Sequence, residues 1–307
     1  MGINLNFGAR RMVAASLAAT LLLAAGCSMF RLAYNNVEIG INWMLDGYFD
    51  LHGEQHALLK SRLESLHAWH RSEELPLYVD GLRAVQARAR QPLQRGDVEW
   101  VVDMSKKRYE RLVREAAPGA ADLLVTISDD QIQSLEKKYA RENKKFAKEH
   151  KLNGTPDEQR KARSKKVLAM IEDWVGNLSD DQETALRQSI ESWPLNYAQV
   201  LEDKQRRQRE FVLLLEKNRD AKTLAPKLQD WMINYEQGRS PEYAAYSRQR
   251  MEHLTALVLQ TDHLLKAKQR AHFIDKLEGY VSDFNALSRP RLAGQPISGA
   301  IAADTAR

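Results

Sequence analysis

Half of the eight histidines in this sequence lie close together, at His52, His56, His67 and His70. Imidazole nitrogens bind zinc and copper, so a row of histidines along one helical face can form a metal site. At about 100° per residue, the four would share one side of a straight helix. His56 and His67 would nevertheless be about 16 Å apart along the axis, so no single ion could use both pairs. Two interpretations remain: weak metal sites, or partly exposed histidines on an amphipathic helix.

A second candidate for chemistry is a pair of carboxylates, Asp46 and Asp50, one helical turn apart on either side of Tyr48. Paired carboxylates can serve as general acid and base. Here no nucleophile or phosphate-binding glycine loop accompanies them, and the sequence holds no Gly-x-Ser-x-Gly, His-Glu-x-x-His or Walker pattern. The pair is therefore interpreted as a solvated face or a helix end, and we expect a protein that is not an enzyme.

Basic side chains concentrate between residues 136 and 166, which hold 12 Lys or Arg against 5 Asp or Glu. We predict that this segment is a helical hairpin and that its cations could bind an anionic partner. Anionic lipid headgroups, peptidoglycan carboxylates and acidic proteins would suit it, whereas a secreted protein would not meet nucleic acid. The alternative is a pair of solvated helical faces. The candidate residues are Lys137, Lys138, Arg141, Lys144, Lys145, Lys148, Arg160, Lys161, Arg163, Lys165 and Lys166.

The N-terminal residues have the pattern of an export signal. Arg10 and Arg11 precede an apolar run over 12–25. Fourteen residues span about 21 Å as a helix, which is short of the roughly 30 Å hydrocarbon core, so this run is typical of a cleaved signal peptide and not of a spanning helix. A twin-arginine signal is less consistent with the residues that follow Arg11.

The only cysteine in the chain comes directly after this run, in Leu23-Ala24-Ala25-Gly26-Cys27. The segment resembles a bacterial lipobox, although Ala24 stands where a large aliphatic residue is usual. The resemblance implies cleavage between Gly26 and Cys27, a diacylglycerol on the Cys27 thiol and acylation of the new amino group. An inert, buried cysteine is the alternative. Two or three acyl chains would hold the protein stably on a membrane, and this lipid is the one non-protein group we expect.

The position after the cysteine is Ser28 and not Asp. By resemblance to the enterobacterial sorting rule, this favours the inner leaflet of the outer membrane, facing the periplasm. We therefore expect a lipid-anchored envelope protein whose membrane contact is made through Cys27.

The elements that must position these residues are predicted to be helical. The chain has 307 residues, of which 43% are apolar and 28% charged, with a net charge of +5. No segment alternates apolar and polar residues over the length of a strand, whereas apolar residues recur at spacings of three and four almost throughout. We predict an all-α fold, an elongated bundle of long, kinked antiparallel helices. Residues 1–26 form the signal peptide, 27–288 the helical domain, with two lobes hinged near 152–156 as an alternative to one body, and 289–307 a disordered tail.

Helix starts can be read directly from the sequence. Capping boxes, in which a hydroxyl residue is followed three positions later by Glu or Gln, occur at Ser128, Thr155 and Ser179. Proline lacks an amide donor, so Pro76 is expected to kink or end the helix that carries the histidines, and Pro194 to kink one helix running from 180 to 217. A last long helix from 241 to 284 is expected to have a joint near Gln260.

One short pattern recurs four times: an aliphatic residue, Gln four positions later, and an apolar residue four beyond that. The glutamines are Gln55, Gln131, Gln182 and Gln269. At Gln131 and Gln182 a capping box with a hydrophobic staple is a sufficient explanation. The segments ending in these two also resemble the Leu-Thr-x-x-Gln motif of small periplasmic stress chaperones, which implies, as an alternative function, the binding of unfolded envelope proteins.

A broader resemblance covers nearly the whole chain after the leader. It rests on four segments in order: residues 31–36 (RLAYNN), 43–51 (WMLDGYFDL), 154–160 (GTPDEQR) and 241–243 (PEY). In these the chain resembles a family of Gram-negative lipoproteins of unknown function, which implies an all-helical lipoprotein and no activity. Together these patterns favour a non-enzymatic envelope protein that works as a scaffold or assembly factor, through an envelope protein or peptidoglycan.

Overall fold

The computed structural model describes residues 29–288, and this part of the chain is helical with no strand. The predicted all-α class is confirmed. After a first helical stretch at 29–35, the elements are α2 (Val37–Phe49), α3 (Gly53–Trp69), the π-helix η1 (His70–Glu74), α4 (Leu75–Ala89), α5 (Arg95–Leu124), α6 (Asp129–Glu149), α7 (Pro156–Val175), α8 (Asp180–Glu191), α9 (Tyr197–Lys217), α10 (Ala221–Ile233), α11 (Pro241–Leu264) and α12 (Ala267–Ser288).

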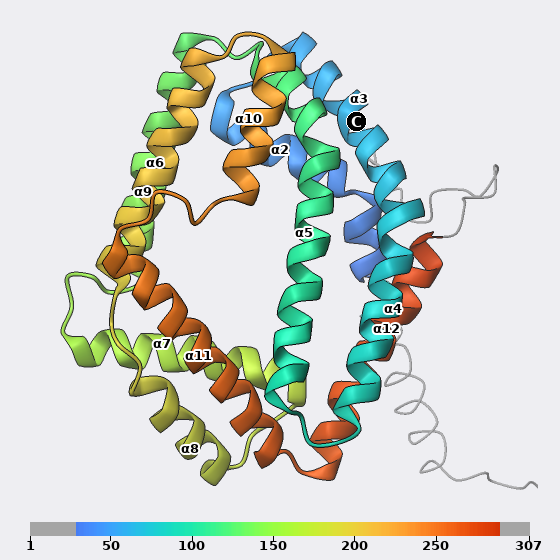
Figure 1. Ribbon diagram of the computed structural model, residues 1–307, viewed down its shortest axis with the longest axis vertical. Helices are drawn as coiled ribbons and strands as arrows, with labels where there is room; N and C mark the ends of the chain where they lie inside the picture. The colour runs from blue at the N-terminus through green and yellow to red at the C-terminus, as the bar shows by residue number, and fades with distance from the viewer. Residues whose placement is uncertain (1–28, 289–307) are drawn as a thin grey trace, which may run out of the picture.

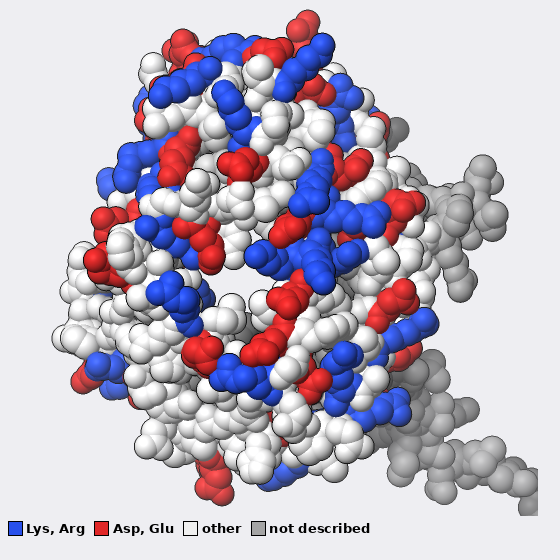
Figure 2. Space-filling model, viewed as in Figure 1, with Lys and Arg blue, Asp and Glu red and all other residues white. Residues whose placement is uncertain are grey.

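The helices are arranged around an open centre (Figure 1). α6 and α9 pack side by side along one edge, and α4 packs against α12 along the other. α7, α8 and α11 close one end, while the space-filling view shows a hollow near the middle of the molecule (Figure 2). The helical bundle is therefore an open ring of packed pairs.

Two separate hydrophobic cores stabilise the ring. The larger one lies between α2, α3, α5, α6, α9 and α10 and includes the fully buried Ile127, Leu135 and Leu224. The smaller lies between α7, α8 and α11 around Leu186 and Ile190, both 0% exposed. Each fully buried side chain of this size contributes about 1.5–3 kcal/mol, so both cores are substantial.

The three predicted capping boxes are confirmed. Ser128 and Thr155 each accept a hydrogen bond from the backbone N–H three residues on, and the Ser179 N–H donates to Gln182. α6, α7 and α8 begin directly after these residues, with Pro156 at the first position of α7. Local capping chemistry therefore decides where these helices start.

Proline acts differently at its two predicted sites. At Pro76 the helix is not broken, but the turn before it, His70–Glu74, widens to a π-helix. At Pro194 the prediction of one kinked helix is wrong, because α8 ends at Glu191 and α9 begins only at Tyr197. The difference arises because Arg163 of α7 donates hydrogen bonds to the carbonyls of Trp193 and Pro194. These carbonyls therefore do not accept from the amides of a continuing helix, and α8 ends before them.

The last long segment is also divided, but not where we predicted. α11 ends at Leu264 and α12 begins at Ala267, so the joint lies a few residues beyond Gln260. The predicted signal peptide, its predicted cleavage site between Gly26 and Cys27, and the predicted disordered tail lie outside the described residues. Among residues 29–288, no helix is both long and apolar enough to cross a membrane.

Candidate functional site

The basic residues predicted between 136 and 166 lie on α6 and α7, and these helices do not form the predicted hairpin. α6 packs mainly on α9, whereas α7 packs mainly on α8. The connection at 150–155 includes Lys151 with a φ of 54°, and it turns the chain from one edge of the ring toward its end (Figure 1). The hairpin prediction is wrong because each helix presents its apolar side to a different partner.

Five of the cations form a continuous row on the outer side of α6, which we call the α6 stripe. Its residues are exposed and follow the helical spacing of three and four: Lys137, Arg141, Lys144, Lys145 and Lys148. Within residues 29–288 none of the five forms an ion pair. The stripe is thus a run of positive charge that the described fold does not neutralise.

The centre of the α6 stripe is Arg141. Its neighbours one helical turn away, at i±3 and i±4, are all lysines: Lys137, Lys138, Lys144 and Lys145. Like charges at these spacings destabilise a helix by a few tenths of a kcal/mol per pair. The sequence of α6 therefore carries an electrostatic cost that helix formation alone does not explain.

A shallow groove of about 490 Å³ runs beside the stripe, between α6 and α9. Tyr139 and Lys144 line it from α6, and Leu201 and Arg209 line it from α9. Across the groove Asn143 donates a hydrogen bond of 2.8 Å to Gln208. The charged stripe and the groove together offer one extended surface to a partner.

The remaining predicted cations have other surroundings. Lys161, Lys165 and Lys166 are exposed on α7. Lys138 instead lies 3.8 Å from Glu142 and 5.2 Å from the Tyr48 ring, and Arg160 pairs with Asp157 at 3.0 Å.

Arg163, a predicted anion-binding residue, does not lie on the exposed basic surface. Its guanidinium donates to the carbonyls of Trp193 and Pro194 at 2.8 and 2.9 Å. Burial lowers the pKa of Arg163, with the Tyr197 and Tyr246 hydroxyls acting in the opposite direction. This arginine therefore holds the end of α8 to α7.

An apolar pocket of about 530 Å³ lies between α3, α5 and α10 and reaches α2, α6 and α9. Leucines 59, 63 and 66 line it from α3, Trp231 and Met232 from α10, and Ala116 and Ala120 from α5. α3 can approach α5 closely here because Gly119 has no side chain, and a Cβ at this position would lie 3.3 Å from the Arg62 Cβ. The pocket could hold apolar side chains or an acyl chain.

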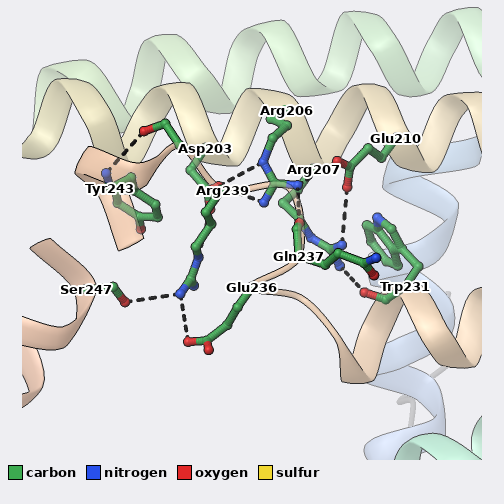
Figure 3. A network of polar contacts seen from close by, with 11 residues as sticks. Asp203, Arg206, Arg207, Glu210, Trp231, Glu236, Gln237, Arg239, Tyr243 and Ser247 are labelled. Atoms are coloured by element: carbon green, nitrogen blue, oxygen red, sulfur yellow. Dashed lines mark hydrogen bonds and ion pairs between the residues drawn. The ribbon is translucent and has the colours of Figure 1, made fainter. Parts of the chain in front are cut away.

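Sequence reasoning did not find the polar network that holds the α10–α11 connection to α9 (Figure 3). Arg206 pairs with Asp203 and Glu210 at 2.7 and 2.6 Å and donates to the Gln237 carbonyl. Arg207 stacks 3.7 Å over the Trp231 ring and donates to the Trp231 carbonyl. The acidic residues three before and four after Arg206 are the local signal for such a network. Arg206 and Arg207 are both bound within the protein, so the network holds the α10–α11 connection in place.

The four histidines do not come together. His67 Nδ1 donates to Glu38 at 2.7 Å, His56 Nδ1 lies 2.9 Å from the Asn42 side-chain oxygen, and His70 hydrogen-bonds to the Tyr34 hydroxyl. His52 is the residue before α3. Over residues 29–288, no three or more His, Cys, Asp or Glu side chains assemble into a group that could hold a metal ion.

Burial is the main cause of the pKa shifts of His70 and Tyr34, which hydrogen-bond to each other. It lowers the pKa of His70, assisted by His67 and Arg71, and it raises the pKa of Tyr34 to about 12. Both groups are therefore neutral near pH 7. The contact joins the first helical stretch to η1.

The two carboxylates near Tyr48 shape a chain turn. The Asp46 carboxylate accepts a hydrogen bond of 3.1 Å from the Leu51 backbone N–H. Asp50 ends α2 in the left-handed conformation, with a φ of 53°. Both residues thus set the direction in which the chain leaves α2.

The four glutamines of the repeated pattern form two buried pairs, Gln55 with Gln131 and Gln182 with Gln269. In every case the side-chain oxygen accepts from the backbone N–H three residues earlier. The glutamines are 2–9% exposed. We call the two pairs with their adjoining helix ends the glutamine corners, and their burial means that these side chains cannot contact a client protein directly.

The fold and this surface define a class: an open helical ring with a basic outer stripe and an apolar pocket. Residues 47–244 match a family of unknown function, DUF6279. The chain belongs to this family, and the matched part holds the α6 stripe and all the lining residues of the apolar pocket except Leu45. No curated protein and no solved structure matches the chain.

Proposed function

We propose that this chain is a lipid-anchored, non-enzymatic protein of the bacterial cell envelope that acts as a scaffold or assembly factor by binding an anionic partner at the α6 stripe. The lipobox-like segment ending at Cys27 supports the anchor. The observation that carries the partner is the environment of Arg141, whose four neighbours one turn away are all cations. Such a row destabilises its own helix, and a polyanion would compensate it.

The position of the stripe fits an anchored protein. α6 lies on the opposite edge of the ring from residues 29–35, which follow the predicted anchor (Figure 1). A protein held at that end would present α6 away from its attachment point. The partner would then be a carboxylate-rich surface in the periplasm, an acidic envelope protein or peptidoglycan.

Crosslinking in cells tests this proposal. A photoreactive amino acid at Gln133, exposed on α6 beside the stripe, should capture a reproducible envelope component. Replacing Lys137, Lys144 and Lys148 with Gln should abolish the capture. The matched control replaces the exposed Lys106, Lys222 and Lys268 with Gln and removes the same charge elsewhere. Equal capture by both triple variants, or equal loss, would contradict a specific role for the stripe.

The anchor is tested separately. Mass spectrometry of the N-terminal peptide should find Cys27 as the first residue and carrying lipid, and Cys27→Ser should remain unlipidated. An intact leader with an unmodified thiol would refute the anchor while leaving the partner experiment valid.

The apolar pocket favours a second candidate, a chaperone for unfolded envelope proteins. Exposed apolar side chains of a client could enter the pocket lined by Leu66 and Met232. The purified protein should then suppress aggregation of a denatured client, and Ala116→Trp, which fills the pocket, should weaken this suppression. Ala68→Trp adds the same bulk at an exposed site on α3 and should not. Equal suppression by both variants would exclude the pocket as the client site.

A further inference from the structure

The outer face of residues 29–47 is apolar in a protein that is otherwise heavily charged. Met29 is 67%, Ile39 69% and Trp43 80% exposed. The exposed positions of this segment are Met29, Leu32, Ala33, Asn36, Ile39, Gly40, Trp43, Met44 and Gly47, and none of them carries a charge. We call these residues the N-terminal face.

The charged side chains of the same segment, Arg31, Glu38 and Asp46, are bound to groups of the protein and are 30–44% exposed. Arg31 pairs with Asp283 of α12 at 2.6 Å, and the Asp283 side chain is only 3% exposed. Glu38 accepts a hydrogen bond of 2.7 Å from the largely buried His67, and Asp46 binds the Leu51 backbone N–H. An ordinary surface helix directs charge to water and apolar residues to the core. Here Ile41 and Leu45 of α2 pack on the larger core as expected, but the opposite, outer face is apolar as well.

This segment is also held firmly against the ring. The Phe30 ring lies 5.7 Å from that of Tyr280 and 5.6 Å from that of Phe284, and the Tyr34 hydroxyl bonds to His70. The N-terminal face therefore has a fixed direction relative to the other helices.

The proposed anchor lies immediately beside this face. Cys27 precedes Met29 by two residues, and two residues of chain span at most about 7 Å. Acyl chains on Cys27 would place the bilayer surface next to Met29. Tryptophan favours the membrane interface, and Trp43 lines a shallow pocket on this face together with Lys60. The Lys60 side chain is 70% exposed and could reach lipid phosphate groups.

We propose that the N-terminal face lies in the interfacial layer of the bilayer that carries the Cys27 lipid, and that this contact fixes the orientation of the ring on the membrane. The proposal rests on the lipid anchor of the proposed function. The occupant of the face is lipid, because the attachment point and the charge-free surface adjoin. A second copy of the chain or a partner protein would be the other occupants.

Spin labelling of the lipidated protein tests the contact. The chain has one cysteine, whose thiol carries the lipid, so an introduced cysteine is the only free thiol. The mature lipidated protein with Ile39→Cys is labelled with a nitroxide and reconstituted into vesicles of phosphatidylethanolamine and phosphatidylglycerol. The control label is at Ala245→Cys, exposed on α11, which lies in front of the ring in Figure 1 whereas α2 lies behind α5 and α10.

Oxygen concentrates in lipid, whereas a nickel chelate stays in water. The ratio of the label's collision rate with oxygen to its collision rate with the chelate should be several-fold higher at residue 39 than at residue 245. Adding Leu32→Glu and Trp43→Glu, both at exposed positions, should return the residue 39 label to the aqueous ratio while the protein stays on the vesicles. Circular dichroism checks that this variant keeps its helices.

An aqueous ratio at residue 39 in vesicle-bound, lipidated protein would overturn the proposal. Spin–spin broadening at residue 39 that disappears on dilution with unlabelled protein would overturn it in favour of a second copy. Protein that carries no lipid and does not sediment with vesicles would instead refute the anchor, which mass spectrometry of the N-terminal peptide shows independently.

Discussion

Gln55 and Gln131, 76 residues apart, donate hydrogen bonds to each other's side-chain oxygens at 3.1 and 2.8 Å. The Gln55 amide also donates to the Thr126 backbone carbonyl, and the Gln131 amide donates to the Asp50 backbone carbonyl. Gln182 and Gln269 repeat this pattern, with the carbonyls of Leu264 and Asn177. All the hydrogen-bonding capacity of the four side chains is used inside the protein.

The two glutamine corners also have the same helix arrangement. At the first, α2 packs on α6 and α3 on α5, and at the second, α7 packs on α12 and α8 on α11. In each corner, the helix that precedes one glutamine packs on the helix that contains the other glutamine. The corners lie at opposite ends of the ring (Figure 1). The same pairing of two glutamines therefore joins two helix-to-helix connections at each end of the ring, and the ring depends on both pairs.

Removal of one glutamine should destabilise the protein strongly. Gln55→Ala leaves the His52 N–H, the Thr126 carbonyl and part of the Gln131 amide without a partner in a buried site. Each such loss costs about 1–3 kcal/mol, so we expect a decrease of about 2–4 kcal/mol in the free energy of unfolding. Urea denaturation measures this.

The pair can be tested by a double-mutant cycle. Adding Gln131→Ala to Gln55→Ala should cost clearly less than the sum of the single changes, because the mutual hydrogen bonds are already lost. Gln133→Ala, exposed on α6, should change stability by less than about 0.5 kcal/mol. Additive effects would show that the two side chains act independently.

Arg163 should matter for stability and not for partner binding. Arg163→Ala removes the donors to the carbonyls that follow α8, and we expect a loss of about 1–3 kcal/mol in thermal or urea unfolding. Arg160→Ala loses only a surface ion pair with Asp157 and should cost less than about 1 kcal/mol. Weaker partner capture by a folded Arg163→Ala protein would assign this residue to the binding surface after all.

Arg141→Gln should make the protein more stable. It removes repulsion with four lysines, each worth a few tenths of a kcal/mol, so we expect a gain of about 0.5–1 kcal/mol at low ionic strength. Salt screens exposed charges, and the gain should shrink in 1 M NaCl. Urea unfolding at the two salt concentrations checks this. Lys106→Gln is the control, because the residues three before and four after Lys106 are the acidic Asp103 and Glu110, so its removal should bring no gain in stability. A loss of stability would show that Arg141 has an attractive partner within the chain.

Glu74 should make stability depend on pH. Its side chain is 0% exposed, 2.8 Å from Arg111, and burial raises the pKa of its carboxyl above the usual 4.5 while Arg108 and Arg111 act in the opposite direction and Glu73 adds to the increase. The folded protein therefore holds this proton more tightly than the unfolded chain. Stability is greatest below the unfolded pKa and decreases as pH rises from about 4.5 through the folded pKa.

The measurement is urea unfolding between pH 4 and 7. Relative to Glu74→Gln, the wild-type protein should lose stability as the pH rises through this window and then reach a plateau. Glu73→Gln, whose side chain is 54% exposed and which makes the smallest contribution to the Glu74 shift, should weaken the pH dependence only slightly. A wild-type profile that runs parallel to that of Glu74→Gln would show that this carboxyl does not titrate differently in the folded state.

The sequence was sufficient for the features that a few adjacent residues decide. Ser128, Thr155 and Ser179 start helices because a hydroxyl group and a carboxamide or carboxylate group three residues on satisfy the first amides of a helix locally. The α6 stripe could also be predicted, since helical spacing alone brings its cations to one face.

Features that depend on distant partners could not be predicted. Nothing near Gln55 indicates that it pairs with Gln131, and the spacing of the four glutamines is irregular. Arg163 reads as one more surface cation, because only the packing of α7 on α8 brings it to the carbonyls after α8. The π-helix at His70–Glu74 likewise depends on the tertiary surroundings of Glu74.

The bond between Arg31 and Asp283 joins residues 252 positions apart. Closure of so long a loop is entropically costly and occurs late in folding. In the proposed export the N-terminus would emerge first, so the helical stretch at 29–35 could already contact η1 through Tyr34 and His70 but would lack the α12 half of its docking surface until α12 had been translocated. Lipid attachment at the predicted site would therefore act on a chain whose first helical stretch is only partly docked, and a chain truncated before α12 would reach the membrane without the Arg31–Asp283 bond.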